Sequence, residues 1–244
     1  MCELFLSETP QAFRKTSNRS AGQIAKSVGS IPTGSKIFVQ KKQTESSYMF
    51  TGIVEKTGKI QKIERRKGKV YFTIRVKNFL ADTKIGDSIS CDGTCLTVVK
   101  KTKDSFEVEL MPETLKLTKF IDSRPEDLVN LELSMKVDQR LDGHFVMGHV
   151  DGVGRVKNVI GNGEYISLVI KTPQKIMKYL AYKGAVAVNG VSLTIAGVGK
   201  NWFKVCLITH TLEVTNLSKL KAGDKVNIEV DMIARYLEKL LSNK

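Results

Sequence analysis

The chain contains one stretch of sequence twice. The segment SISCDGTCLTVV (residues 88–99) aligns with AVAVNGVSLTIA (185–196) at an offset of 97, which places Gly93 on Gly190. Three further blocks repeat in the same order at an offset of 96 or 97: 52–60 with 148–156, 113–120 with 210–217, and 127–135 with 224–232. Units of a solenoid span about 20–50 residues, so the longer period indicates two copies of a whole domain.

Short segments with alternating apolar residues make up each copy. They are VYFTIRV (70–76), SFEVEL (105–110), YISLVI (165–170) and WFKVCLI (202–208). This alternation is typical of half-buried strands, and turns such as Asp92-Gly93 and Asn189-Gly190 separate them. Many short strands in close succession predict an all-β fold, in which each copy is a small antiparallel barrel or sandwich.

The repeat divides the chain into domains. We expect a first domain at residues 49–143 and a second at 144–231, with short helices inside them, one of these at 172–184. A C-terminal helix is predicted at 232–244, because an apolar stripe recurs there at helical spacing: Ile233, Tyr236, Leu237, Leu240 and Leu241. The stripe lies outside the repeat, and it serves either self-association or packing on its own chain.

Residues 1–48 differ from the repeat, since they are basic, rich in Ser and Thr, and without a clear apolar period. They are an organellar transit segment, a disordered extension, or sequence upstream of a true start at Met49. Cys2, Cys91, Cys95 and Cys206 are too scattered for a disulfide framework, which favours a reducing compartment. We therefore expect a cytoplasmic protein, or a plastid protein if residues 1–48 are a transit peptide.

The net charge of +14 does not by itself indicate a nucleic-acid partner. The lysines are spread along the chain, and the tightest basic cluster, at 62–70, falls where a hairpin turn is expected. No aromatic residues that could stack on bases are interleaved with this cluster, so it is interpreted as solvated surface. No apolar run reaches the ~18 residues of a membrane helix, and no membrane partner is expected.

Common catalytic and metal-binding motifs are missing from the sequence. His144 and His149 lack the HExxH spacing, and Cys91 with Cys95 forms a lone CxxxC, so no metal site is predicted. There is also no P-loop, dinucleotide fingerprint or GxSxG elbow. Small polar residues in the two matched turns remain as candidates. Singly, such residues satisfy backbone groups or fill a core, but together with histidines they could bind a polar heterocycle and move its protons.

Five motifs occur in one order along the repeat region. They are MFTGIVE (49–55), DGTCLTV (92–98), MPETL (111–115), DGHFVMGHVDG (142–152) and YKGAVAVNGVSLTI (182–195). Together they resemble riboflavin synthase of the trimeric alpha-chain type, over about residues 49–232. The resemblance implies a tandem pair of similar six-stranded Greek-key β-barrels with short helices, and a C-terminal α-helix at 232–244 that assembles a homotrimer.

The resemblance also implies an activity. Two molecules of 6,7-dimethyl-8-ribityllumazine would react without metal or redox cofactor, and a four-carbon unit would pass between them in the last step of riboflavin biosynthesis. The products would be riboflavin and 5-amino-6-ribitylamino-uracil. Each barrel is expected to bind one lumazine, and catalysis is expected where the first barrel of one chain meets the second barrel of a neighbour. Lumazine synthase is a further expected partner.

Motif positions in the resemblance assign candidate site residues. The first-barrel pocket is expected to use Phe50, Ser88, Cys95, Thr97, Met111, Thr114 and His149, and the second Lys183, Asn189, Ser192, Thr194, Ile208 and Thr211. The 7-methyl protons of the lumazine are acidic enough for a base with a near-neutral pKa, so His149 is expected to transfer protons with His144 as its helper. Ser88 and Cys95 are expected to activate a nucleophile, to bind the acceptor ring, or both.

Two positions depart from the family pattern. Asn189 stands where some members have Asp and cannot ionise, so an acid–base role there is in doubt. His210 stands where a Pro-Glu pair is often seen, and it is interpreted as incidental. A non-catalytic lumazine- or flavin-binding antenna protein would share the double barrel, but such proteins tend to lose the GHxxxGH motif and the second-site residues. This chain keeps them, which favours the enzyme.

Overall fold

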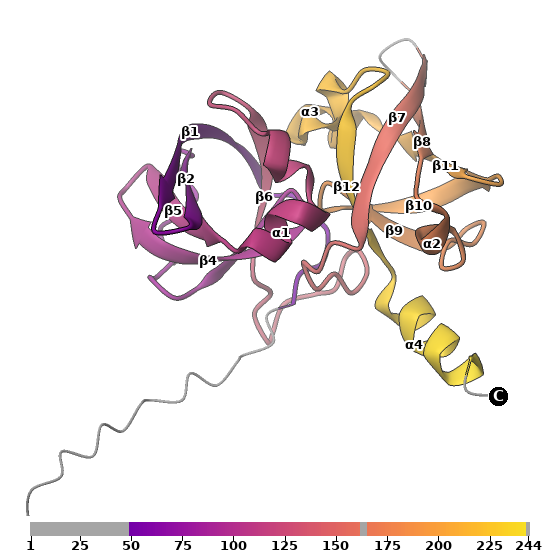
Figure 1. The fold of residues 1–244 in the computed structure, drawn as a ribbon, viewed down its shortest axis with the longest axis horizontal. Coiled ribbons are helices and arrows are strands. Elements are labelled where there is room, and N and C mark those ends of the chain that lie inside the picture. Colours follow the sequence, from indigo (N-terminus) through magenta and orange to yellow (C-terminus); the bar gives the residue numbers. More distant parts are fainter. Residues whose placement is uncertain (1–48, 162–164, 243–244) are drawn as a thin grey trace, which may run out of the picture. The chain divides into compact units, whose positions relative to one another are not determined.

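The computed structural model describes residues 49–161 and 165–242. The predicted N-terminal extension at 1–48 lies outside these residues. Within them the chain forms two barrels of strands, with short helices between strands and one longer helix at the end (Figure 1). None of the helices in the described part of the chain is long and apolar enough to span a membrane.

The first six strands close into an antiparallel barrel in the order β1-β2-β5-β4-β3-β6. They are β1 (Lys56–Arg66), β2 (Lys69–Arg75), β3 (Ser88–Cys91), β4 (Thr94–Lys101), β5 (Ser105–Leu110) and β6 (Leu128–Leu133). Apolar side chains at alternate positions fill its interior, among them Phe72, Phe106 and Leu131 at 1% exposure or less. The predicted strands at 70–76 and 105–110 are therefore β2 and β5, shifted by one residue at most.

The last six strands close into a second barrel with the same order of equivalent strands, β7-β8-β11-β10-β9-β12. They are β7 (Gly152–Gly161), β8 (Ile166–Lys171), β9 (Ala185–Val188), β10 (Val191–Val198), β11 (Trp202–Leu207) and β12 (Lys225–Val230). Leu168, Phe203 and Ile228 are fully buried at the positions equivalent to Phe72, Phe106 and Leu131. The expected tandem pair of six-stranded barrels is confirmed.

Irregularities of the strands repeat as well. The pairing of β1 with β2 shifts between Ile60 and Lys62, and that of β7 with β8 shifts between Val156 and Asn158. A bulge also lies at the equivalent points of β4 and β10. Because a bulge increases the local twist of a strand, each barrel is closed by the same device at the same positions.

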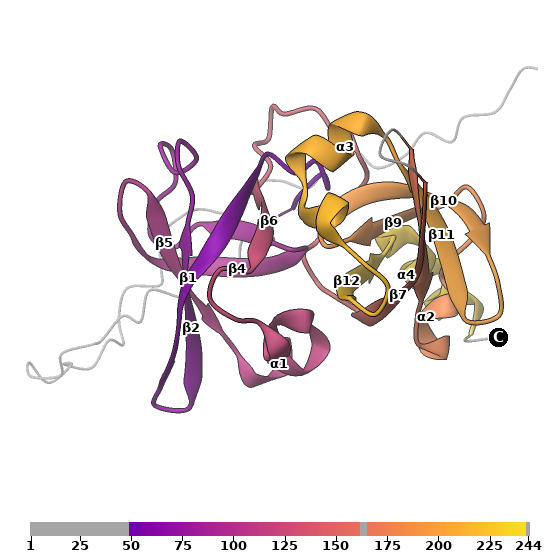
Figure 2. The same cartoon turned by 90° about the horizontal axis from the view of Figure 1, so that it is seen from above.

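The helices are short except for the last. They are α1 (Pro112–Leu117), α2 (Gln174–Met177), α3 (Thr209–Val214) and α4 (Met232–Leu241), with 3-10 helices η1 (Lys119–Asp122) and η2 (Asn216–Lys219). Figure 2 shows α1 beside the first barrel and α3 beside the second. The helix expected at 172–184 is confined to the four residues of α2, because turns follow Met177. The predicted C-terminal helix is confirmed as α4.

The two matched turns of the sequence meet between the barrels. A Cβ atom added to Gly93 would lie 2.7 Å from the backbone nitrogen of Gly190, so the two turn tips are in direct contact. The neighbouring Asp92 and Asn189 are completely buried. Each turn carbonyl then accepts a hydrogen bond from the opposite barrel: that of Asn189 from the Asn130 amide, and that of Asp92 from the Asn227 amide, both at 2.9 Å. The turn tips are therefore part of the contact between barrels.

Candidate functional site

The first barrel carries a group of small polar side chains on its outer face. Leu96 and Val98 of β4 point into the barrel, so the alternating Cys95 and Thr97 point outward. Ser88 of β3 pairs directly with Thr97 and is itself buried. We call Ser88, Cys95 and Thr97 the first-barrel group; the structure brings these three predicted residues together on one hairpin.

The Cys95 thiol is half-buried. Its burial raises the pKa of the thiol, and a hydrogen bond with Ser88 opposes that rise without cancelling it. The thiol is therefore protonated at neutral pH. A protonated thiol can hydrogen-bond a ligand, but it is a poor nucleophile, because thiolate is the reactive form.

The second barrel presents Ser192 and Thr194 on β10 in the same way, alternating with the inward-facing Leu193 and Ile195. Thr194 pairs with Ala185, so the hydroxyl that Ser88 carries is missing at this position. The Oγ atom of Ser192 lies 2.6 Å from Nδ1 of His144. We call His144, Ser192 and Thr194 the second-barrel group. Ser192 and Thr194 occupy the positions of Cys95 and Thr97, whereas His144 does not stand at the position equivalent to Ser88.

The histidines of the GHFVMGH motif are held by different strands. His144 is half-buried and bonded to Ser192 of β10, and burial lowers the pKa of its imidazole. His149 is exposed and follows Gly148, whose carbonyl accepts a 2.9 Å hydrogen bond from the Cys95 N–H on β4. The structure thus joins His144 to the second-barrel group, whereas the sequence had suggested it as a helper of His149.

Most of the remaining candidates lie at matched positions of the two copies. Met111 and Ile208 are the residues that precede α1 and α3, and their side chains are 54% and 62% exposed. Thr114 and Thr211, one turn later, are half-buried, and each backbone carbonyl accepts a 2.6 Å bond from a threonine hydroxyl four residues on. Lys183 is exposed in the left-handed conformation (φ 65°).

Phe50 and Asn189 are not open to solvent. Phe50 is fully buried with Val146 and Ala187, and it pairs with Val146 across the repeat. The Asn189 side chain is engaged on both ends, since its oxygen accepts from the Asn227 N–H and its nitrogen donates to Asn216. A substrate-binding role for Asn189 stays a prediction, while the structure shows its role in the contact between barrels.

Sequence reasoning missed two buried carboxylates. Glu132 of β6 and Glu229 of β12 occupy equivalent positions and are each 3% exposed. Burial raises the pKa of both to about 7, more than their hydrogen bonds lower it. A glutamate at the same place in both copies of a repeated block, in LELSM (131–135) and IEVDM (228–232), was the signal that could have revealed them.

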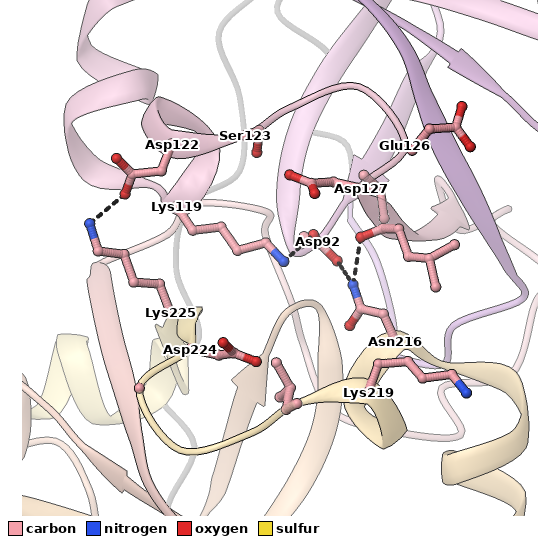
Figure 3. A pocket seen from close by; sticks show the side chains of 14 residues that line it. Asp92, Lys119, Asp122, Ser123, Glu126, Asp127, Asn216, Lys219, Asp224 and Lys225 are labelled. Atoms are coloured by element: carbon pink, nitrogen blue, oxygen red, sulfur yellow. Dashed lines mark hydrogen bonds and ion pairs between the residues drawn. The ribbon is translucent and has the colours of Figure 1, made fainter.

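A cavity of about 490 Å³ opens elsewhere, between the two barrels (Figure 3). Lys119 forms an ion pair with Asp92 at its wall, and Lys225 forms one with Asp122. None of the predicted site residues lines this cavity. Its lining consists of Asp92, Lys119, Asp122, Ser123, Glu126, Asp127, Leu128, Val129, Asn216, Lys219, Leu220, Gly223, Asp224 and Lys225. The cavity therefore belongs to the contact between barrels and is separate from both groups.

Comparison with known proteins finds one domain family twice in the chain. The model of the lumazine binding domain matches residues 51–134 and again 147–231. The riboflavin synthase of Photobacterium phosphoreum is 45% identical over 194 residues, which cover 79% of this chain and 89% of that protein. The riboflavin synthase of Bacillus subtilis (strain 168) is 40% identical over 193 residues, 79% of this chain and 90% of that protein.

Solved structures show the same architecture. The crystal structure of LumP complexed with riboflavin superposes with a TM-score of 0.70 at 25% identity, over 74% of this chain and 98% of that chain. LumP complexed with 6,7-dimethyl-8-(1'-D-ribityl) lumazine gives a TM-score of 0.68 with the same identity and coverage.

Proposed function

The chain belongs to the riboflavin synthase family of enzymes, and on this premise we propose that it converts two molecules of 6,7-dimethyl-8-ribityllumazine into riboflavin and 5-amino-6-ribitylamino-uracil. A four-carbon unit leaves one molecule and joins the other. Two identical reactants account for every atom of the two products, so the reaction needs no external oxidant or reductant.

The observation that carries this proposal is the inequality of the two polar groups. The first-barrel group has Ser88 and a thiol at Cys95, whereas the equivalent positions of the second barrel are Ala185 and a Ser192 bonded to His144. A dismutation needs two sites for one substrate that differ in what they do to it. Binding both molecules in defined positions replaces a bimolecular encounter and lowers the free-energy barrier of the reaction by several kcal/mol.

The proton transfer is assigned to His149. His149 is exposed and directly follows the glycine that contacts Cys95, which places the residue beside the first-barrel group and leaves it open to a ligand. Removing a 7-methyl proton of the lumazine requires a base that is neutral near pH 7, which suits a histidine. Ser88 and the protonated Cys95 then act as hydrogen-bonding partners of the ring.

A neighbouring copy of the chain completes the site in this proposal. Both groups lie on outer faces of barrels, and the same barrels carry exposed apolar side chains: Met111 at 54%, Ile208 at 62% and Ile53 at 44%. Apolar surface of this kind is typical of an interface. We infer a homotrimer in which the first barrel of one chain faces the second barrel of the next, so that two bound lumazines meet.

An assay with the lumazine tests the function directly. The purified protein is mixed with 6,7-dimethyl-8-ribityllumazine, and products are quantified by absorbance and chromatography. We expect one riboflavin and one pyrimidine for every two lumazines consumed. The residue assignment fails if His149→Ala and Ser88→Ala each leave turnover within threefold of the unmodified protein.

A lumazine- or flavin-binding antenna is the second candidate, because the LumP structures bind these ligands with the same fold. Stoichiometric lumazine binding without product would favour it. Cytoplasmic or plastid location and association with lumazine synthase stay predictions. Mass spectrometry of the mature N-terminus distinguishes a cleaved transit segment from an intact extension.

A further inference from the structure

The segment before each barrel contacts the opposite barrel. The carbonyl of Gly52 accepts a 2.8 Å hydrogen bond from the Ser192 N–H, and that of Gly148 accepts from the Cys95 N–H at 2.9 Å. Both glycines have positive φ, 76° and 74°. A Cβ added to Gly148 would lie 2.5 Å from that of Cys95, and one on Gly52 would lie 2.7 Å from that of Ser192. Only glycine allows these approaches.

We call residues 51–52 and 147–149, which contact the opposite barrel, the crossing segments. A buried glutamate binds each of them. Glu132 accepts from the N–H and hydroxyl of Thr51 at 2.6 and 2.7 Å, and from the Gly52 N–H at 3.0 Å. Glu229 accepts from three consecutive backbone N–H groups: Met147 at 2.8 Å, Gly148 at 3.0 Å and His149 at 3.1 Å. Each carboxylate thus binds the glycine that touches the opposite barrel.

The negative charge of each carboxylate is stabilised by these hydrogen-bond donors. Among the described residues, neither Glu132 nor Glu229 forms an ion pair with a lysine or arginine. Backbone N–H groups and, for Glu132, the Thr51 hydroxyl are therefore the direct partners of the two carboxylates. Hydrogen bonds to a charged acceptor are about twice as strong as neutral ones. The position of each crossing segment depends on its carboxylate.

We call each buried glutamate together with its hydrogen-bond donors a clamp. The two clamps differ in one of their three hydrogen bonds. Glu132 takes its third bond from a side-chain hydroxyl, whereas Glu229 takes it from the backbone of His149. The carboxylate of Glu229 therefore acts on the dihedral angles of the residue that carries the imidazole. It is also close enough to influence the titration of the Cys95 thiol.

We propose that Glu229 is the positioning residue of His149: its carboxylate holds the backbone of residues 147–149 so that the imidazole stays at the first-barrel group. This inference rests on the proposed function, in which His149 transfers the proton. Glu132 performs the corresponding task for the segment around Gly52 at the second-barrel group, and it supplies a matched control with the same burial and the same side chain.

A double-mutant cycle on the full-length protein tests the proposal. In Glu229→Gln, an amide NH₂ replaces one oxygen and faces backbone N–H donors, so at least one hydrogen bond of the clamp is lost. We expect kcat to fall about tenfold, and no further loss beyond twofold when the change is added to His149→Gln. The loss of kcat in Glu132→Gln is expected to multiply with the loss in His149→Gln. A Glu229→Gln loss that also multiplies, or a kcat within twofold of the unmodified protein, overturns the proposal.

A second measurement does not depend on turnover. The chain has 3 histidines, so ring signals in ¹H–¹³C NMR spectra can be assigned with His149→Gln and His144→Gln. Glu229→Gln should move the His149 signal, and Glu132→Gln should leave it in place. Glu229→Asp, which keeps the charge one methylene shorter, replaces Glu229→Gln if that variant does not fold. An unmoved His149 signal contradicts the positioning role. Absence of riboflavin formation by the unmodified protein instead contradicts the proposed function.

Discussion

His144 and Ser192 form a hydrogen bond of 2.6 Å between Nδ1 and Oγ, although the two residues lie 48 positions apart in different parts of the repeat. The bond assigns His144 to the second barrel. Burial lowers the pKa of the imidazole, which is therefore neutral near pH 7, and its Nε2 is buried without a partner in the described part of the chain. A neutral ring that shares one nitrogen with Ser192 orients the serine hydroxyl for a ligand.

Ser192→Ala is expected to weaken the binding of one of two lumazines about three- to tenfold, since a neutral hydrogen bond contributes about 0.5–1.5 kcal/mol. Isothermal titration calorimetry with the lumazine would show the change in one site only. His144→Gln should add little to Ser192→Ala, because both remove the same pair. Cys95→Ala is the matched control and should affect the other site. Equal loss at both sites in Ser192→Ala would contradict the assignment.

The strands and the duplication could be predicted from the sequence because they depend on local alternation and on the repeat itself. The segments that cross between barrels could not. Gly148 is conspicuous in the sequence, but its contact with Cys95 joins residues whose partnership no local pattern encodes. The same holds for Asn189. The dipeptide Asn189-Gly190 is typical of an exposed turn, but Asn189 is buried because the equivalent turn at Asp92 packs against it.

Stability should depend on pH through Glu132 and Glu229. Their pKa values are raised from 4.5 to about 7 in the folded state, so the folded chain binds these protons more tightly than the unfolded chain. Their stabilising contribution is complete below about pH 4.5 and is lost as the pH rises through about 7. The loss is up to about 3 kcal/mol for each carboxyl.

Urea denaturation at pH 5 and pH 8 measures this effect. The double variant Glu132→Gln/Glu229→Gln cannot titrate at these positions, and its free energy of unfolding should change less between the two pH values than that of the unmodified chain. An identical pH dependence in both proteins would show that the two carboxyls do not contribute.

The ion pair between Asp92 and Lys119 should be essential for the stability of the first copy. The neutral pair at the equivalent positions of the second copy should be able to replace it. Asp92 is completely buried and lies 2.7 Å from the Lys119 ammonium, while the equivalent residues Asn189 and Asn216 are joined by a neutral hydrogen bond. Lys119→Met leaves the carboxylate without its cation and is expected to cost about 3–5 kcal/mol.

Asp92→Asn/Lys119→Asn reproduces the neutral pair of the second copy. Chemical denaturation should show that this double variant recovers most of the stability lost in Lys119→Met. If the double variant is as unstable as Lys119→Met, the pair is not interchangeable with its counterpart, and the difference between the copies has another cause.

The C-terminal helix α4 should hold the trimer together. One side of it is bonded to its own barrel, since Arg235 pairs with Asp151 at 3.0 Å and Glu238 pairs with Lys178 at 2.5 Å. The other side carries the apolar stripe, whose members are 53–68% exposed: Ile233, Tyr236, Leu237, Leu240 and Leu241. The helix extends from the second barrel (Figure 1), and its exposed stripe is available to another chain.

Deleting residues 233–244 should therefore yield monomers in sedimentation equilibrium. Leu240→Glu should do the same without removing the helix, and Lys239→Glu beside it is the control that keeps the assembly. A trimer that survives both the deletion and Leu240→Glu would place the interface elsewhere on the barrels.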